Sequence, residues 1–300
     1  MGKRVSVRGT HLWVDDLGDP ERPAVLYLHG GPGSGCYDFV LHQGQRLAAS
    51  LRLIAVDQRG VLRSDPLGDH SLSLRDLVED AEALRIHLGI AQWSLIGHSF
   101  GGYMGLLYAA TYPGAIDRLV FENPTFDLAS SARSLLRRAA LEYGVLGNQE
   151  YARKCLAIAY DDTLDDRSVW EGFSVLSPGL HAQRDNLYVY GPDKQFFQRL
   201  VQESRFGEEL WSRGADHQSA LYEEGALFEP LTFRFSRVSH PTLLIRGSHD
   251  AVFGLDQLHS YLEAKPDSKL LVAGESGHFV HVEQPDLFAT AVANWVVPTG

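Results

Sequence analysis

Ser99, Asp250 and His278 have the residue types that nucleophilic catalysis requires, and they occur in that order along the chain. A serine hydroxyl is a weak nucleophile until a neighbouring base takes its proton and a carboxylate orients that base. Each of the three follows an apolar run typical of a buried strand, so each is expected where a parallel sheet ends. The pattern therefore predicts acyl transfer through a covalent serine intermediate.

Ser99 lies in the sequence Gly97-His98-Ser99-Phe100-Gly101, which fits the pattern G-x-S-x-G. An apolar run precedes this pentapeptide, and a helical pattern from Tyr103 to Tyr112 follows it. A serine on such a strand-to-helix turn takes a strained backbone conformation, so the flanking residues must lack side chains. Gly97 and Gly101 meet this requirement, and we interpret Ser99 as the nucleophile.

The acid and the base each have alternatives in the sequence. Glu122 also ends a predicted strand, but we prefer Asp250, because it directly follows the strand before His278. His281 is a second choice of base. His98 and His249 are interpreted as packing or loop residues, since the turn would direct the His98 side chain away from Ser99.

Two backbone N–H groups are needed to stabilise the oxyanion that forms on the substrate. The residue after the nucleophile, Phe100, supplies one in this kind of turn. The second is expected from the glycine loop 29–33, where Gly31 is the better candidate. This loop has neither the Lys-Ser/Thr of a P-loop nor the spacing of a dinucleotide-binding motif, so we do not interpret it as a nucleotide site.

The elements that must position these residues alternate between strands and helices. Bounded apolar runs predict strands at 24–29, 51–57, 93–97, 118–122, 241–247 and 268–273. Helical periodicity predicts helices at 74–88, 103–112, 128–143, 148–160, 194–203 and 285–296. The alternation predicts an α/β fold with a doubly wound, mostly parallel sheet built from residues 1–124 and 239–300. Residues 125–238 are predicted to form an inserted helical subdomain, which we call the cap.

Composition limits the possible partners. The net charge of −11 argues against nucleic acid, and no apolar stretch in the sequence is long enough to span a bilayer. Cys36 and Cys155 are the only cysteines, too few for a disulfide framework or a metal cluster. With no secretory signal pattern at Met1, we expect a cytoplasmic protein without a metal or organic cofactor.

Taken together, these motifs resemble the α/β-hydrolase superfamily. The segments His29-Gly30-Gly31-Pro32-Gly33, Asp57-Gln58-Arg59-Gly60 and Gly277-His278-Phe279 resemble, more narrowly, the proline iminopeptidase family. The resemblance implies a triad of Ser99, Asp250 and His278 that releases an N-terminal residue, preferably proline, from peptides. It also implies that carboxylates of the cap bind the free amino group of the substrate.

Candidate residues for substrate binding in the cap are Glu142, Glu223, Glu224 and Trp211. The carboxylates would pair with a substrate ammonium if they face the pocket; otherwise they are ordinary helix charges. Three functions stay open: an aminopeptidase of the iminopeptidase type; an esterase, lactonase or amidase acting on a small molecule; and a ligand-binding protein without turnover. The form G-H-S-F-G is shared by many esterases and lactonases, so it suits the second function equally well.

Overall fold

The computed structural model describes residues 2–191 and 195–297, and over these residues the strands form one eight-stranded sheet. The order is β1-β2-β4-β3-β5-β6-β7-β8. The strands are β1 (Lys3–Val7), β2 (Thr10–Leu17), β3 (Ala24–Leu28), β4 (Arg52–Asp57), β5 (Trp93–His98), β6 (Ile116–Glu122), β7 (Thr242–Gly247) and β8 (Lys269–Ala273). β2 is antiparallel to both of its neighbours, and all other neighbouring strands in this order are parallel to each other. The predicted mostly parallel sheet is therefore confirmed.

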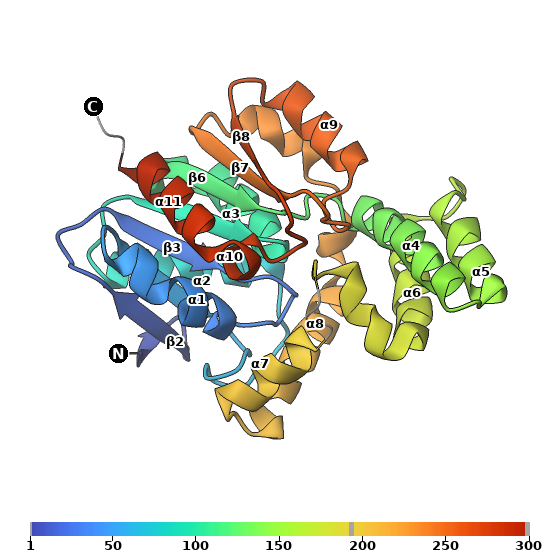
Figure 1. Ribbon diagram of the computed structural model, residues 1–300. Helices are drawn as coiled ribbons and strands as arrows, with labels where there is room; N and C mark the ends of the chain where they lie inside the picture. Colours follow the sequence, from blue (N-terminus) through green and yellow to red (C-terminus); the bar gives the residue numbers. More distant parts are fainter. Residues whose placement is uncertain (1, 192–194, 298–300) are drawn as a thin grey trace.

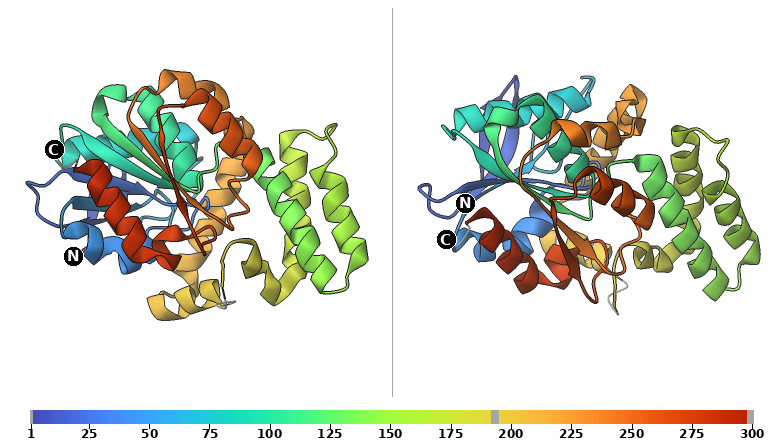
Figure 2. Two further views of the ribbon diagram at one scale, coloured as in Figure 1. Left: turned by 45° about the horizontal axis from the view of Figure 1, so that its top comes forward. Right: turned by 90° about the horizontal axis from the view of Figure 1, so that it is seen from above.

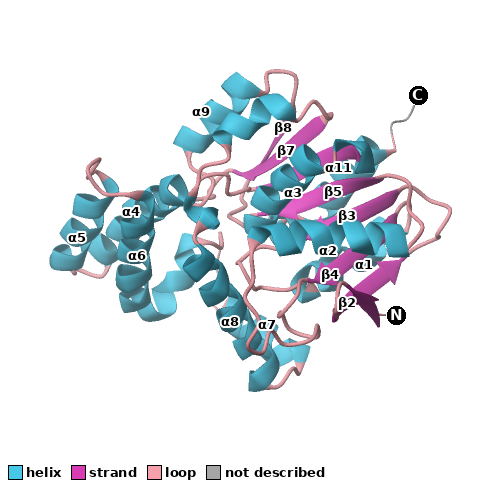
Figure 3. Cartoon of the chain, turned by 180° about the vertical axis from the view of Figure 1, so that it is seen from behind, coloured by secondary structure: helices cyan, strands magenta, loops and turns pink. Residues whose placement is uncertain are grey.

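Helices cover both faces of this sheet. The core helices are α1 (Tyr37–Ala48), α2 (Leu74–His87), α3 (Phe100–Thr111), α9 (Leu255–Ala264), α10 (Val280–Glu283) and α11 (Pro285–Val296). α1 and α11 pack on the near face in Figure 1, and α2 and α3 cover the other face, seen from behind in Figure 3. Successive side chains of β3 alternate between the two layers: Val25 and Tyr27 join the α1 side, and Leu26 and Leu28 join the α3 side.

The chain between β6 and β7 is helical. It contains α4 (Leu128–Val145), α5 (Gln149–Ala159), α6 (Asp166–Leu176), α7 (Phe196–Ser204) and α8 (Glu208–Glu224), together with the short 3₁₀ helices η2 (Ser177–Leu187), η3 (Ala226–Phe228) and η4 (Thr232–Arg237). α4, α5 and α6 share an apolar cluster of their own and form a lobe beside the sheet, drawn in green and yellow-green in Figure 2. α8 instead contacts the core, where Arg213 donates hydrogen bonds to the carbonyls of Leu62 and Ser64 at 3.0 and 2.8 Å.

Several elements lie outside the sequence prediction. β1 and β2 form an antiparallel hairpin that the apolar runs do not mark, because β2 contains Asp15 and Asp16. These acids are paired with Arg63 at 3.2 Å and Arg52 at 2.8 Å, so distant arginines make the strand stable. The helices α1, α6, α8, α9 and α10 are also additional. The predicted start of a helix at Lys194 lies outside the described residues.

No helix in the described part of the chain combines the length and the apolar character that crossing a membrane requires.

Candidate active site

Ser99 sits on a sharp turn between β5 and α3. Its backbone angles are φ 53° and ψ −120°, a conformation that is strained for any residue with a side chain. A Cβ on Gly97 would collide with the carbonyl of Gly101, and one on Gly101 would collide with the carbonyl of Leu28. The steric requirement inferred from the sequence is therefore present in the structure, and Ser99 opens a helix at its N-terminus.

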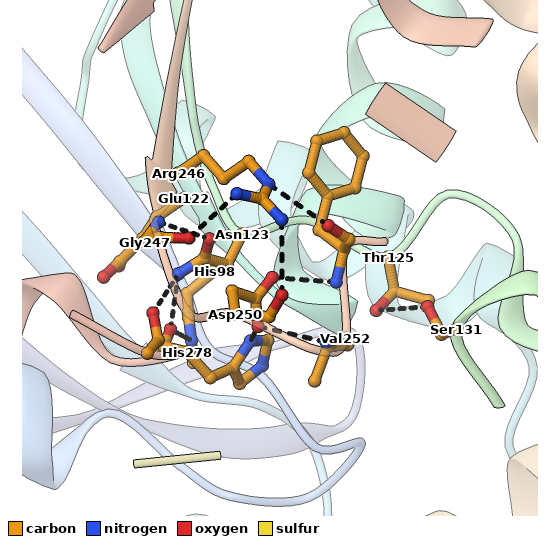
Figure 4. Close-up of polar contacts among 12 residues, drawn as sticks. His98, Glu122, Asn123, Thr125, Ser131, Arg246, Gly247, Asp250, Val252 and His278 are labelled. Atoms are coloured by element: carbon orange, nitrogen blue, oxygen red, sulfur yellow. Dashed lines mark hydrogen bonds and ion pairs between the residues drawn. The ribbon is translucent and has the colours of Figure 1, made fainter. Parts of the chain in front are cut away.

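His278 and Asp250 form a buried pair beside this turn. The His278 Nδ1 and the Asp250 Oδ1 are 2.9 Å apart. Figure 4 marks this contact with a dashed line. Asp250 also accepts hydrogen bonds from the backbone N–H of Val252 and Phe253 at 3.1 and 2.8 Å. Burial alone would raise the pKa of Asp250, but His278 and these N–H groups hold it below its ordinary value. The ionised carboxylate therefore accepts a hydrogen bond from Nδ1–H, which leaves Nε2 as the basic atom.

Ser99 and His278 line the same cavity, which has a volume of about 420 Å³. Arg184 and Asp38 are the only charged Arg, Lys, Asp or Glu side chains lining it among the described residues. A second, smaller cavity of about 60 Å³ also contains Ser99 and His278, and its other side chains are mainly apolar, including Leu128. Ser99 and His278 thus lie between a large cavity of mixed polarity and a small, mainly apolar one.

The backbone of His278 is anchored by side chains of neighbouring strands. Asn123 donates from Nδ2 to the carbonyls of Gly277 and His278 at 3.0 and 2.9 Å, and accepts from the N–H of Gly247 at 2.9 Å (Figure 4). His98 Nε2 lies 3.0 Å from the same His278 carbonyl. Sequence reasoning did not select Asn123; its only signal is its position directly after β6.

The N–H groups of Gly31 and Phe100 have no hydrogen-bond acceptor among the described residues. The loop that carries Gly31 is held by His29, whose Nδ1 lies 2.9 Å from the Gly30 carbonyl and whose Nε2 accepts from the N–H of Gln58 at 3.2 Å. Burial lowers the pKa of His29, so the neutral ring donates with one nitrogen and accepts with the other. His29 thus fixes the backbone next to Gly31.

Asp57 holds the segment that follows the glycine loop. Its Oδ1 accepts from the N–H of Cys36 at 2.8 Å, and its Oδ2 lies 2.7 Å from the Nε of Arg63. In the same motif, Arg59 makes an ion pair with Asp80 at 2.7 Å. The sequence Asp57-Gln58-Arg59-Gly60 thus ties the glycine loop to the rest of the core.

The alternative acid and base form a separate buried pair. Glu122 Oε1 accepts from the backbone N–H of His281 at 2.8 Å, and both its oxygens lie 2.9 Å from His281 Nδ1. The second ring nitrogen, Nε2, lies 3.4 Å from Asp38 Oδ2. His249 is exposed and stacks on Tyr190 with ring centroids 4.1 Å apart. Asp250, and not Glu122, is thus the carboxylate bonded to His278.

His98, Glu122 and His281 also have ligand atoms within 4.8 Å of one another, as a metal site would require. Burial alone would lower the pKa of His281, but Glu122 and Asp38 raise it to about 10. A protonated imidazole has no lone pair for a metal ion, so this cluster is better described as a buried ion pair.

The cap carboxylates selected from the sequence do not reach the cavity of Ser99. Glu142 lies within the cap, 2.8 Å from Asn186 Nδ2 and 3.3 Å from Arg138. Glu223 and Glu224 line a separate groove against residues 60–73, and Glu224 also caps the N–H of residue 226 at 3.0 Å. The expected placement of these three carboxylates is therefore corrected: each has its own partner or faces another groove.

Trp211, the fourth cap candidate, lies beside the cavity of Ser99 and not in its lining. It lines a cavity of about 310 Å³ that shares Pro32, Ser34 and Asp38 with the cavity of Ser99. Trp211 therefore borders a neighbouring compartment rather than the one lined by Ser99 and His278.

A profile of the family described as alpha/beta hydrolase fold matches residues 23–285. The chain belongs to this family. The alpha/beta hydrolase is similar to a proline iminopeptidase of Xanthomonas citri, with 29% identity over 292 residues, which is 89% of this chain and 87% of that protein. It is also similar to a probable proline iminopeptidase of Leptolyngbya boryana, with 25% identity over 295 residues, 89% of this chain and 84% of that protein. The resemblance inferred from the motifs is thereby confirmed.

Solved structures also resemble this alpha/beta hydrolase along its length. A proline iminopeptidase-related protein from Thermus thermophilus has a TM-score of 0.72 at 21% identity, over 99% of this chain and 97% of that one. An esterase from Thermogutta terrifontis has a TM-score of 0.68 at 21% identity, over 99% and 98% of the two chains. At such identities the likeness speaks for the fold alone.

Proposed function

We propose that this alpha/beta hydrolase is a serine hydrolase that works through an acyl-enzyme formed on Ser99. The observation that carries the proposal is that His278, which is bonded to Asp250, lines the same cavity as a serine held on a strained turn. Strain of this kind is stored where it serves a function.

In the proposed reaction, His278 Nε2 removes the hydroxyl proton as the Ser99 Oγ attacks the substrate carbonyl. The N–H groups of Gly31 and Phe100 stabilise the oxyanion, each by roughly 3 kcal/mol. His278 then gives its proton to the leaving amine or alcohol, and the acyl group stays on Ser99. A water molecule, deprotonated by the same imidazole, releases the acid and restores the serine.

The first candidate substrate is a short peptide from which an N-terminal residue is released. The support for it is the similarity to proline iminopeptidases over most of both chains. The second candidate is a small ester, lactone or amide. It is favoured by the cavity itself, because the described residues lining it include no carboxylate from the cap.

A fluorophosphonate probe tests the chemistry. We expect it to label the native protein and to leave Ser99→Ala unlabelled; a native protein without label would indicate a ligand-binding role instead. Turnover of proline β-naphthylamide and of p-nitrophenyl butyrate then separates the two substrates. Ester hydrolysis without any aminopeptidase activity would exclude the first candidate.

A further inference from the structure

A second cavity adjoins the one that contains Ser99. Its volume is about 310 Å³, and Asp38 is the only charged side chain that lines it among the described residues. Its aromatic lining comes from α1, from two cap helices and from the segment after His278, and consists of Tyr37, Phe196, Phe197, Trp211 and Phe279. An aromatic wall around a single carboxylate is a surface suited to an organic cation.

The aromatic wall is preorganised by its own contacts. Phe196 and Phe197 each pack near Phe279, with ring centroids 4.9 and 5.6 Å apart. On the opposite side, Trp211 lies 6.0 Å from the ring of Phe206, which in turn packs on Tyr37 at 5.0 Å. Rings held in this way lose little further side-chain entropy when a ligand binds.

Asp38 is a buried carboxylate whose charge is only partly neutralised. Its one ion pair among the described residues is with His281 Nε2, at 3.4 Å. His281 is shared with Glu122, which lies nearer, at 2.8 to 2.9 Å. The imidazolium of His281 between the two carboxylates leaves one net negative charge. Of these three residues, which we call the buried trio, Asp38 is the one that lines both cavities.

The backbone N–H of Phe39 also favours the ionised Asp38, and Arg184 lines the cavity of Ser99, but no second ion pair of Asp38 is found among the described residues. Burial lowers the pKa of His98 to about 3, and burial together with His281 lowers the pKa of His42, so both rings are neutral near pH 7. Burial would raise the pKa of Asp38, but His281 keeps it below its ordinary value. A buried anion of this kind is stabilised most by a cation that enters from the cavity.

We propose that this cavity is a subsite for a hydrophobic organic cation, in which the Asp38 carboxylate pairs with a substituted ammonium group and Trp211 and the phenylalanines enclose its apolar substituent. The inference rests on the proposed function, since the cation would be the part of the substrate that is bound beside Ser99. The charge recognition that the sequence suggested for cap glutamates is thereby assigned to α1.

Calorimetry with benzylammonium and benzyl alcohol tests the subsite directly, since the two probes have nearly the same shape and differ in charge. We expect benzylammonium to bind the native enzyme at least about tenfold more tightly, as a hydrogen bond to a charged group is typically worth that much. Equal binding of the two probes, or no binding of benzylammonium, would overturn the proposal.

Three variants locate the binding. Asp38→Asn should reduce the preference for the cation to less than about threefold, and Trp211→Ala should weaken both probes together. Glu223→Gln, which makes the same carboxylate-to-amide change in a separate groove, should alter neither. A preference that survives in Asp38→Asn would contradict the assignment. Fluorophosphonate labelling reports whether Asp38→Asn is folded, and Trp211→Ala tests the cavity without touching the buried trio.

Binding to Ser99→Ala separates this inference from the proposed function. That variant cannot form an acyl-enzyme, yet it should bind benzylammonium as the native protein does. If the native protein is neither labelled nor active but shows the charge preference, the proposed function fails and the subsite stands. If it is labelled and active without the preference, only the subsite fails.

Discussion

His98 Nε2 lies 3.0 Å from the carbonyl oxygen of His278, so the residue before Ser99 holds the backbone of His278. The carbonyl can only accept, so Nε2 carries the proton. Burial keeps this ring neutral, because it lowers the pKa of His98 to about 3. The ring centroids of His98 and His278 lie 4.7 Å apart, so the turn at Ser99 and the loop of His278 are in contact.

Replacing His98 by Phe should lower kcat for p-nitrophenyl butyrate by roughly 10-fold to 100-fold, because a small displacement of the base is costly in rate. KM should change much less. His249→Phe is the matched control, since that exposed ring stacks only on Tyr190 among the described aromatic residues, and its kinetics should match those of the native enzyme. Unchanged kcat in His98→Phe would show that Asn123 alone positions the carbonyl.

Asp250→Asn and Glu122→Gln should impair different properties, the first the catalytic rate and the second the stability of the fold. The first removes the carboxylate that orients His278 and should lower kcat by about 10³-fold to 10⁴-fold. The second leaves His281 without its closest counter-charge and should lower the free energy of unfolding by roughly 3 to 5 kcal/mol. Steady-state kinetics and urea unfolding measure the two effects; a larger loss of kcat in Glu122→Gln would reverse the assignment of the acid.

Stability should fall as the pH rises above neutrality. Glu122 and Asp38 raise the pKa of His281 to about 10 against burial, which would lower it. The pKa of His281 in the folded protein exceeds its unfolded value of about 6.5. The stabilisation by the protonated ring is therefore complete below about pH 6.5 and is lost as the pH approaches 10. The slope should be at most about 1.4 kcal/mol per pH unit. Urea unfolding at several pH values measures it, and the slope should be absent in His281→Gln.

The stabilisation that Glu122, Asp38 and His281 give the fold should also be lost in acid. The pKa values of Glu122 and Asp38 lie below their ordinary values, although burial would raise them, because His281 favours the ionised forms. Their contribution is therefore present above the unfolded pKa values of about 4 and is lost as the pH falls through the lower folded values. Acid unfolding of Asp38→Asn, followed by tryptophan fluorescence, should start from a lower stability and show a shallower decline than the native protein.

Gly101→Ala should prevent the turn at Ser99 from forming, since the added Cβ would collide with the carbonyl of Leu28. Backbone atoms cannot move aside easily, so we expect insoluble or inactive protein. Gly105→Ala lies in the same helix, but there a Cβ would meet Phe121 at 3.4 Å, an ordinary contact. Its free energy of unfolding should stay within about 1 kcal/mol of the native value. An active, stable Gly101→Ala would refute the steric argument for the turn.

The fold was predictable where the signal is local. The bounds of β3 to β8 lie within two residues of the predicted strands. The strands β3 to β7 are largely buried and therefore continuously apolar, whereas the edge strand β8 carries an apolar run although its side chains are mostly exposed. The β1–β2 hairpin was not predictable, since Asp15 and Asp16 are tolerated there only through arginines far along the chain. The helix α1, which carries Asp38, also escaped the sequence analysis.

By itself, the sequence determined the turn at Ser99 and the order of its partners, because the need for Gly97 and Gly101 follows from the sterics of a few adjacent residues. Tertiary structure decided which carboxylate meets which histidine: Asp250 bonds to His278, whereas Glu122 and Asp38 share His281. It also decided that Glu142, Glu223 and Glu224 lie away from the cavity and that Asp38 lines it. The physical reason is that charge pairing depends on distances between segments up to 243 residues apart, which no local pattern encodes.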